Sequence, residues 1–149
     1  MPSKTIVCIG TGPSLTHEQI EVAREKGFIL YGCNLVYASV PDLAVLYAVN
    51  KAFYDFYWYD RDFPLREYPA QKWTTSAQAA EDYDLNWIAE KNAPGLSSDP
   101  AFVHHGHGSG YTLVNLAYLH GADKIILLGY DLKYAPDYDG RIRQIGSGK

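Results

Sequence analysis

The feature that most constrains the fold is a glycine-rich turn, Gly10-Thr11-Gly12-Pro13-Ser14, between an apolar run and an amphipathic stretch. Residues 5–9 are typical of a buried strand, and Thr16 with Gln19 forms a capping-box pattern at the start of a helix that Gly27 ends. A strand, a tight turn and a helix N-terminus present backbone N–H groups and a positive dipole end to an anion. The turn therefore indicates a phosphate-bearing ligand, a nucleotide first of all, and a strand-to-helix turn without a ligand is the alternative.

The turn departs from the dinucleotide fingerprint. Leu15 stands where the pattern G-x-G-x-x-G needs its third glycine, and Asn34 stands where an acidic residue usually binds the ribose of NAD. An ordinary NAD site is therefore not expected. A β-branched residue at Gly12 would block the close approach of a ligand to the backbone, so we expect Gly12→Val to abolish nucleotide binding while leaving the fold intact.

Apolar runs alternate with helical stretches along the chain, which predicts a parallel sheet. Strand-like runs follow at residues 28–33, 43–49, 71–75 and 124–128, and helices are expected at 15–26, 77–91 and 111–120. The residues expected to face the core from the last two helices are Ala80, Leu85, Trp87 and Ile88, then Val114, Ala117, Tyr118 and Gly121. The fold class is α/β: a single Rossmann-like domain over residues 1–134, with a mostly parallel sheet and helices on both faces, and a loop or flexible tail at 135–149.

Polar residues follow several of the expected strands. Asn34 and Asn50 come after the second and third strands, and Asp131 comes after the last. In open α/β sheets, ligands bind at the carboxyl ends of the strands. These residues are therefore expected to share a ligand crevice with the glycine turn, although Asp131 has the alternative of capping its own loop.

Charge and composition exclude several classes of partner. The net charge is −4 and no cluster of Lys or Arg is present, so a nucleic acid or an anionic membrane is not expected as a partner. The sequence has no apolar run of membrane-spanning length and no secretion signal, which predicts a cytoplasmic protein. Cys8 and Cys33 fall in expected strands and are interpreted as small buried hydrophobic residues, with a disulfide between them left open.

Aromatic residues are abundant, with 13 tyrosines and 3 tryptophans, and several gather in residues 53–59. Such residues can line a cleft or a subunit interface, but a helix packed in the core or against a sister subunit is favoured. A homo-oligomer is expected.

Three histidines, His104, His105 and His107, lie in a glycine-rich loop. One of them could act as a base near neutral pH, or they could bind a metal with Asp131. The alternative is that they are solvent-exposed loop residues.

The order and spacing of the motifs resemble a known group of enzymes. The motifs are Gly10-x-Gly12-Pro13-Ser14-Leu15, Cys33-Asn34, Asn50, Gly108-Ser109-Gly110 and Gly129-x-Asp131. Over residues 5–134 this set resembles the bacterial lipooligosaccharide sialyltransferases, which use CMP-activated sialic acid. A related domain-of-unknown-function group, with motility-associated flagellin glycosylation factors and archaeal-type 6-hydroxymethylpterin diphosphokinases, is more similar at Gly129-x-Asp131-Leu132-x-Tyr134.

The resemblance implies specific binding roles. The glycine turn would surround the nucleotide phosphate and ribose, Asn34 and Asn50 would bond the sugar nucleotide, and Ser109 with Gly110 would meet the cytidine or its carboxylated sugar. The candidate substrate-binding residues are Gly10, Thr11, Gly12, Pro13, Ser14, Asn34, Asn50, Ser109, Gly110, Gly129, Tyr130 and Tyr134.

The sequence also departs from the sialyltransferase pattern. Thr11 replaces an asparagine that contacts the nucleotide, and Lys133 aligns with a tyrosine that stabilises the leaving phosphate, with Tyr134 one place later. The histidine base of that family has no match, because no histidine follows His120. The candidate catalytic residues are therefore Asp131, His107 and Lys133.

Together these features predict a glycosyltransferase of the CMP-sialic-acid-dependent type that binds a nucleotide or nucleotide sugar and requires no cofactor. One alternative is a diphosphokinase acting on a pterin-like alcohol, with Mg²⁺ held by Asp131 and the substrate phosphates. The other is a nucleotide-binding protein without catalysis, a shortened relative encoded by a phage or mobile element.

Overall fold

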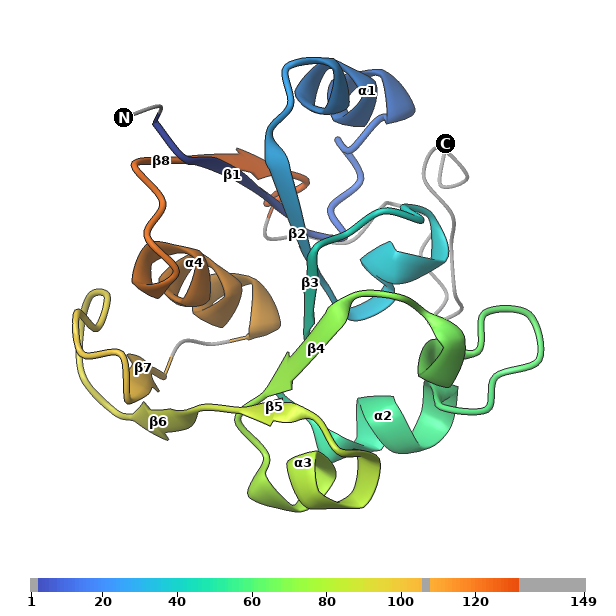
Figure 1. Cartoon of the computed structure of the whole chain (residues 1–149), viewed down its shortest axis with the longest axis vertical. Helices are drawn as coiled ribbons and strands as arrows, with labels where there is room; N and C mark the ends of the chain where they lie inside the picture. The colour runs from blue at the N-terminus through green and yellow to red at the C-terminus, as the bar shows by residue number, and fades with distance from the viewer. Residues whose placement is uncertain (1–2, 106–107, 132–149) are drawn as a thin grey trace.

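The computed structural model, which describes residues 3–105 and 108–131, is built on a six-stranded parallel sheet (Figure 1). The strand order is β5-β4-β3-β2-β1-β8, and every neighbouring pair is parallel. The strands are β1 (Thr5–Ile9), β2 (Ile29–Cys33), β3 (Val45–Tyr47), β4 (Gln71–Thr74), β5 (Asn86–Trp87) and β8 (Lys124–Leu128). The predicted α/β class with a mostly parallel sheet is confirmed.

The strand order reverses at β1. The chain builds β2 to β5 outward on one side of β1 and then returns to place β8 on the other side, with Thr5 opposite Lys124 and Ile9 opposite Leu128. In open α/β sheets the point of reversal opens a crevice at the carboxyl ends of the strands. A ligand site is therefore expected among the residues that follow β1 and β8.

Helices cover both faces of the sheet (Figure 1). One face carries α1 (His17–Glu25), η1 (Asn34–Ala38), α2 (Lys51–Tyr57), η2 (Leu65–Glu67) and α3 (Ala77–Tyr83). The other carries α4 (Ser109–Leu119) and a small parallel sheet of β6 (Ala89–Lys91) and β7 (Phe102–His104). Within the described ranges, no helix is long and apolar enough to cross a membrane.

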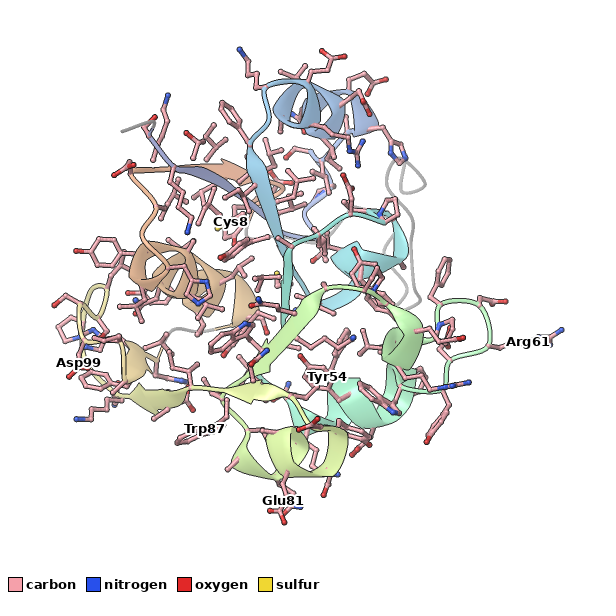
Figure 2. The ribbon with its side chains drawn as sticks, viewed as in Figure 1. Cys8, Tyr54, Arg61, Glu81, Trp87 and Asp99 are labelled. Carbon is pink, nitrogen blue, oxygen red and sulfur yellow. The ribbon has the colours of Figure 1, made fainter. Side chains whose placement is uncertain are left out.

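The sheet separates two apolar cores. Side chains alternate between faces along a strand, so Val7 and Ile9 of β1 enter the core under α1 while Ile6 and Cys8 enter the core under α4. The aromatic segment belongs to the first core, where Tyr54 of α2 is fully buried (Figure 2). The favoured interpretation of this segment as core packing is therefore confirmed for Tyr54, whereas Phe56 remains exposed.

The first strand, turn and helix form as the sequence predicts. The Thr16 hydroxyl accepts a hydrogen bond from the Gln19 backbone at 3.2 Å, and the Gln19 side chain accepts one from the Thr16 backbone at 3.0 Å. Gly27, with φ of +72°, follows the C-cap of α1. This βα unit is fixed by local chemistry.

The predicted helix over residues 77–91 is wrong in its second half. Helix α3 ends at Tyr83, because Asp84 adopts a left-handed conformation with φ of +54° and caps the helix. The chain then extends into β5, which pairs with β4. Trp87, expected to face the core, is 51% exposed and lies on the outer edge of the sheet (Figure 2).

The helix predicted over residues 111–120 is present as α4, but its inward face is only partly as predicted. Ala117 is buried, whereas Tyr118 is 45% exposed. Leu113 and Leu116 face the sheet instead. Most residues of this helix are apolar, so the helix has no distinct polar face. The sequence therefore does not show which side of the helix packs on the sheet.

Candidate functional site

The carboxyl edge of the sheet brings together most of the residues that the sequence singled out. The glycine turn follows β1, and Asn34 directly follows β2. Asn50 lies beyond β3 as the N-cap of α2, and Asp131 lies beyond β8. Because these strands are parallel neighbours, their carboxyl ends meet along one edge. Their placement at this edge is as expected, and the ligand crevice that they were expected to share stays a prediction.

The first turn of α4 lies across this edge. The Val49 N–H, just after β3, donates to the Ser109 hydroxyl at 3.1 Å. The Tyr130 hydroxyl, just after β8, donates to the Gly110 carbonyl at 2.9 Å. The N-terminus of α4 therefore joins the ends of β3 and β8, and the buried Ser109 side chain contributes to holding it there.

The turn after β1 packs directly on the segment after β8. The Gly12 N–H donates to the Gly129 carbonyl at 2.7 Å. The Ser14 N–H donates to one oxygen of Asp131 at 2.7 Å, and the Ser14 hydroxyl donates to the other at 2.6 Å. The carboxylate of Asp131 thus binds donors of the turn that the sequence assigned to a phosphate.

Packing explains why glycines occupy this junction. A Cβ atom on Gly12 would lie 2.4 Å from both the Gly129 carbonyl oxygen and an Asp131 carboxylate oxygen. A Cβ on Gly10 would lie 3.2 Å from the Tyr130 ring, and one on Gly110 would lie 3.1 Å from the same ring. A side chain on Gly12 would therefore meet the Gly129 backbone and the Asp131 carboxylate before any ligand, so the structure argues against the expectation that Gly12→Val leaves the fold intact.

Three polar side chains at this edge make no hydrogen bond to residues 3–105 or 108–131: those of Thr11, Asn34 and Asn50. Asn34 is half-buried and adopts a left-handed backbone conformation with φ of +51°. Asn50 caps α2 without using its side chain as the cap. A primary amide both donates and accepts, so this set can bond nucleobase edges and sugar hydroxyls.

The thiols nearby are not reactive groups. Cys8 and Cys33 are buried, as the sequence predicts, and both are free, which answers the question of a disulfide that the sequence left open. Burial raises the pKa of each thiol to about 12, so both stay protonated at neutral pH. Burial likewise raises the pKa of Tyr130, which keeps its hydroxyl neutral and able to donate to Gly110.

Two of the three candidate histidines have structural contacts. His104 lies in β7, with its ring nitrogen Nδ1 3.0 Å from the Gly95 carbonyl oxygen. His105 lies 3.1 Å from a Glu90 carboxylate oxygen at the surface. Within the described part of the chain, no group of three or more His, Cys, Asp or Glu side chains is arranged to hold a metal ion.

Three candidate residues lie outside the described ranges: His107, Lys133 and Tyr134. The predicted tail at residues 135–149 lies outside them as well. The roles assigned to these residues stay predictions.

One important residue escaped the sequence analysis. Asn115 of α4 is fully buried, and its side-chain oxygen accepts hydrogen bonds from the backbones of Ser97 and His104, each at 2.9 Å. Its amide nitrogen donates to the Ser97 carbonyl at 3.0 Å. The sequence signal for this role was a single asparagine within an apolar helix, because a polar side chain buried there needs hydrogen-bond partners. Asn115 positions β7 and the preceding loop against α4.

A surface cavity of about 390 Å³ lies away from this set of residues. It is lined by α1 and by Ser39, Pro41 and Asp42, and by none of the predicted site residues. Arg24 spans it, bonded to Glu21 and to Asp42, and this pairing lowers the pKa of the Asp42 carboxyl. These exposed ion pairs are structural contacts of α1 with its neighbouring loop.

Comparison of the chain with protein-family models, with curated proteins and with solved structures finds no match.

Proposed function

We propose that the carboxyl edge of the sheet binds a nucleotide sugar and that the protein is a glycosyltransferase of the CMP-sialic-acid-dependent type. The observation that carries the proposal is the set of unbonded side chains of Thr11, Asn34 and Asn50 along one edge, across from the N-terminus of α4. Each comes from a different strand end, and because Thr11 and Asn50 are exposed and Asn34 is half-buried, all three polar groups are accessible to a ligand.

The chemistry of this edge favours a ligand with many neutral polar groups. The described candidate residues include no cationic side chain, so binding would use amides, hydroxyls and backbone N–H groups. The charge of a phosphate would be met by the first N–H groups and the dipole of α4, which begins at this edge. In the glycine turn, the Ser14 N–H and hydroxyl already donate to the Asp131 carboxylate, so these two donors are not available to a phosphate.

The resemblance to the sialyltransferases supports glycosyl transfer as the reaction. Both oxygens of Asp131 accept hydrogen bonds from Ser14, so this carboxylate holds the turn after β1. On the strength of the resemblance, we favour glycosyl transfer without a metal over Mg²⁺-dependent diphosphoryl transfer. A cytoplasmic location and a homo-oligomer belong to the same proposal, and the two free buried thiols support a reducing compartment.

Nucleotide binding tests the proposal directly. Thermal unfolding is measured with CMP, CDP, UDP, ATP and NAD, where a ligand at 100 times its Kd stabilises by about 2.7 kcal/mol. CMP is expected to stabilise most, and Asn34→Ala and Asn50→Ala are each expected to weaken CMP binding by about tenfold, the loss of one good hydrogen bond. The matched control is Asn92→Ala, an exposed asparagine in the loop after β6.

The reaction class has its own test. Hydrolysis or transfer of CMP-sialic acid that persists in EDTA is expected. Turnover of ATP that is lost in EDTA and restored by Mg²⁺ would support the diphosphokinase instead. Binding of NAD or ATP in preference to CMP, or full CMP binding in both asparagine variants, would contradict the proposed site.

A further inference from the structure

Among the residues that the structure describes, the sheet ends in an apolar strand, β8, with one unpaired side. Within the described residues, β8 pairs with β1 on one side and with no strand on the other (Figure 1). Its sequence is Lys-Ile-Ile-Leu-Leu, and Leu127 is 50% exposed. Proteins usually protect such edges with short strands, charges or proline. The opposite edge, β5, is only 2 residues long, whereas β8 has 5 residues and a single charge at its first position.

Hydrogen bonds to β1 fix which backbone groups of β8 face outward. The Leu128 carbonyl accepts from the Gly10 N–H at 2.8 Å, and the Lys124 N–H donates to the Lys4 carbonyl at 3.3 Å. Backbone groups of alternate residues point to opposite sides of a strand. The N–H and C=O groups of Ile125 and Leu127 therefore point to the open side.

We propose that a second copy of this chain pairs antiparallel along β8, with the two-fold axis at Ile126. Residues with outward backbone groups must pair with each other, so Ile125 of one copy exchanges hydrogen bonds with Leu127 of the second copy. A two-fold axis could lie at any residue of β8, but only an axis at Ile126, the middle residue, pairs all 5 residues of the strand. The two sheets then form one continuous sheet.

The side chains of β8 suit pairing with themselves. Opposed residues in an antiparallel pair lie on the same face, so Ile125 of each copy would cover the exposed Leu127 of the other. Lys124 of one copy lies opposite Leu128 of the other, so the two lysine ammonium groups do not face each other. A second copy of β8 has outward backbone groups, apolar side chains and a charge position that all match those of the first copy. This match favours a second copy of the chain over a strand of unrelated sequence. The inference rests on strand geometry and is independent of the proposed ligand.

Sedimentation velocity over a range of concentrations tests the interface. The full chain is expected to form a dimer. Leu127→Lys is expected to weaken dimerisation by roughly tenfold to thirtyfold, because the change occurs twice per dimer. Val22→Lys, which places the same charge on the 51% exposed Val22 of α1, is the control and is expected to dimerise normally. Circular dichroism checks that both variants fold.

Single cysteines test the register. The two Ile126 residues would form a non-hydrogen-bonded pair with Cα atoms about 4.5 Å apart, a distance that allows a disulfide. Ile126→Cys is therefore expected to cross-link under mild oxidation, and Leu127→Cys, which lies opposite Ile125, is not. A monomer at every concentration, a dimer indifferent to Leu127→Lys, or cross-linking through Leu127→Cys alone would each overturn the proposal.

Discussion

The carboxylate of Asp131 accepts one hydrogen bond from the Ser14 backbone at 2.7 Å and another from the Ser14 hydroxyl at 2.6 Å. These residues follow β8 and β1, the two strands between which the strand order reverses. A side-chain anion therefore lies at the turn where the sequence predicts the anion of a ligand.

Removing this carboxylate should loosen the junction. Asp131→Ala is expected to lower the free energy of unfolding by about 1–2 kcal/mol, toward the low end for hydrogen bonds to a charged group because the contact is exposed. Ser14→Ala, which removes the hydroxyl bond and keeps the backbone bond, should lose less. Urea denaturation measures both variants, and an unchanged midpoint for Asp131→Ala would contradict a structural role for the contact.

The same change should alter anion binding at the turn. Phosphate and the Asp131 carboxylate would compete for the Ser14 donors, so Asp131→Ala should bind inorganic phosphate about tenfold more tightly than the unmodified chain. Titration calorimetry in a phosphate-free buffer gives the comparison, with Ser14→Ala combined with Asp131→Ala as the control that removes one donor. Equal affinity in the presence and absence of Asp131 would show that the turn does not bind phosphate.

Gly12 should tolerate no side chain. Gly12→Ala is expected to destabilise the protein by about 3 kcal/mol or more, because its Cβ would lie 2.4 Å from backbone and carboxylate oxygens. The matched control is Gly95→Ala, since Gly95 has φ of +72° and open space around its Cβ position. That change should lose only about 1 kcal/mol, from backbone strain. Similar melting temperatures for both variants would contradict the packing described for Gly12.

His120 should make stability depend on pH. Its ring nitrogen Nδ1 lies 2.6 Å from the Tyr31 hydroxyl, and burial, with a smaller effect of Lys4, lowers its pKa from 6.5. The unfolded chain therefore takes up a proton that folded His120 resists. Stability should be fully present above pH 6.5 and should decline as the pH falls through the lowered folded pKa.

Replacement of His120 tests this dependence. His120→Asn removes the titrating group and should flatten the pH dependence of unfolding below pH 6.5 relative to the unmodified chain. His17→Asn, at the exposed start of α1, is the matched control. An identical slope in the His120 variant would show that another group is responsible.

The two thiols should be unreactive in the folded protein. Cys8 and Cys33 are buried with pKa values raised to about 12, so a thiol reagent such as DTNB should label neither under native conditions. Both should react after unfolding in denaturant. Rapid labelling of the native chain would require local opening of β1 or β2.

Sequence reasoning succeeded where local chemistry decides structure. The Thr16 and Gln19 capping box and the left-handed Gly27 set the ends of α1 without help from distant residues. It failed at Asp84, because a non-glycine residue in a left-handed cap has little sequence signal. It also failed at Tyr118, because α4 is apolar on nearly all sides.

The candidate site was predictable in its position but not in its contacts. Parallel strands place Asn34 and Asn50 at one edge whatever their side chains do. The bond from Ser14 to Asp131 joins residues 117 positions apart and depends on β8 pairing beside β1. The alternating pattern predicts a parallel sheet but does not say which strands are neighbours.

Tyr130 works as a spacer for the carboxyl edge. Its ring fills the space between Gly10 and Gly110, and its hydroxyl bonds the Gly110 carbonyl, so the separation between the β1 turn and the start of α4 depends on one aromatic ring. The distance between these two segments is thereby fixed by a side chain from a third. In the proposed binding mode, the size of ligand that the edge admits would depend on a residue that need not touch the ligand.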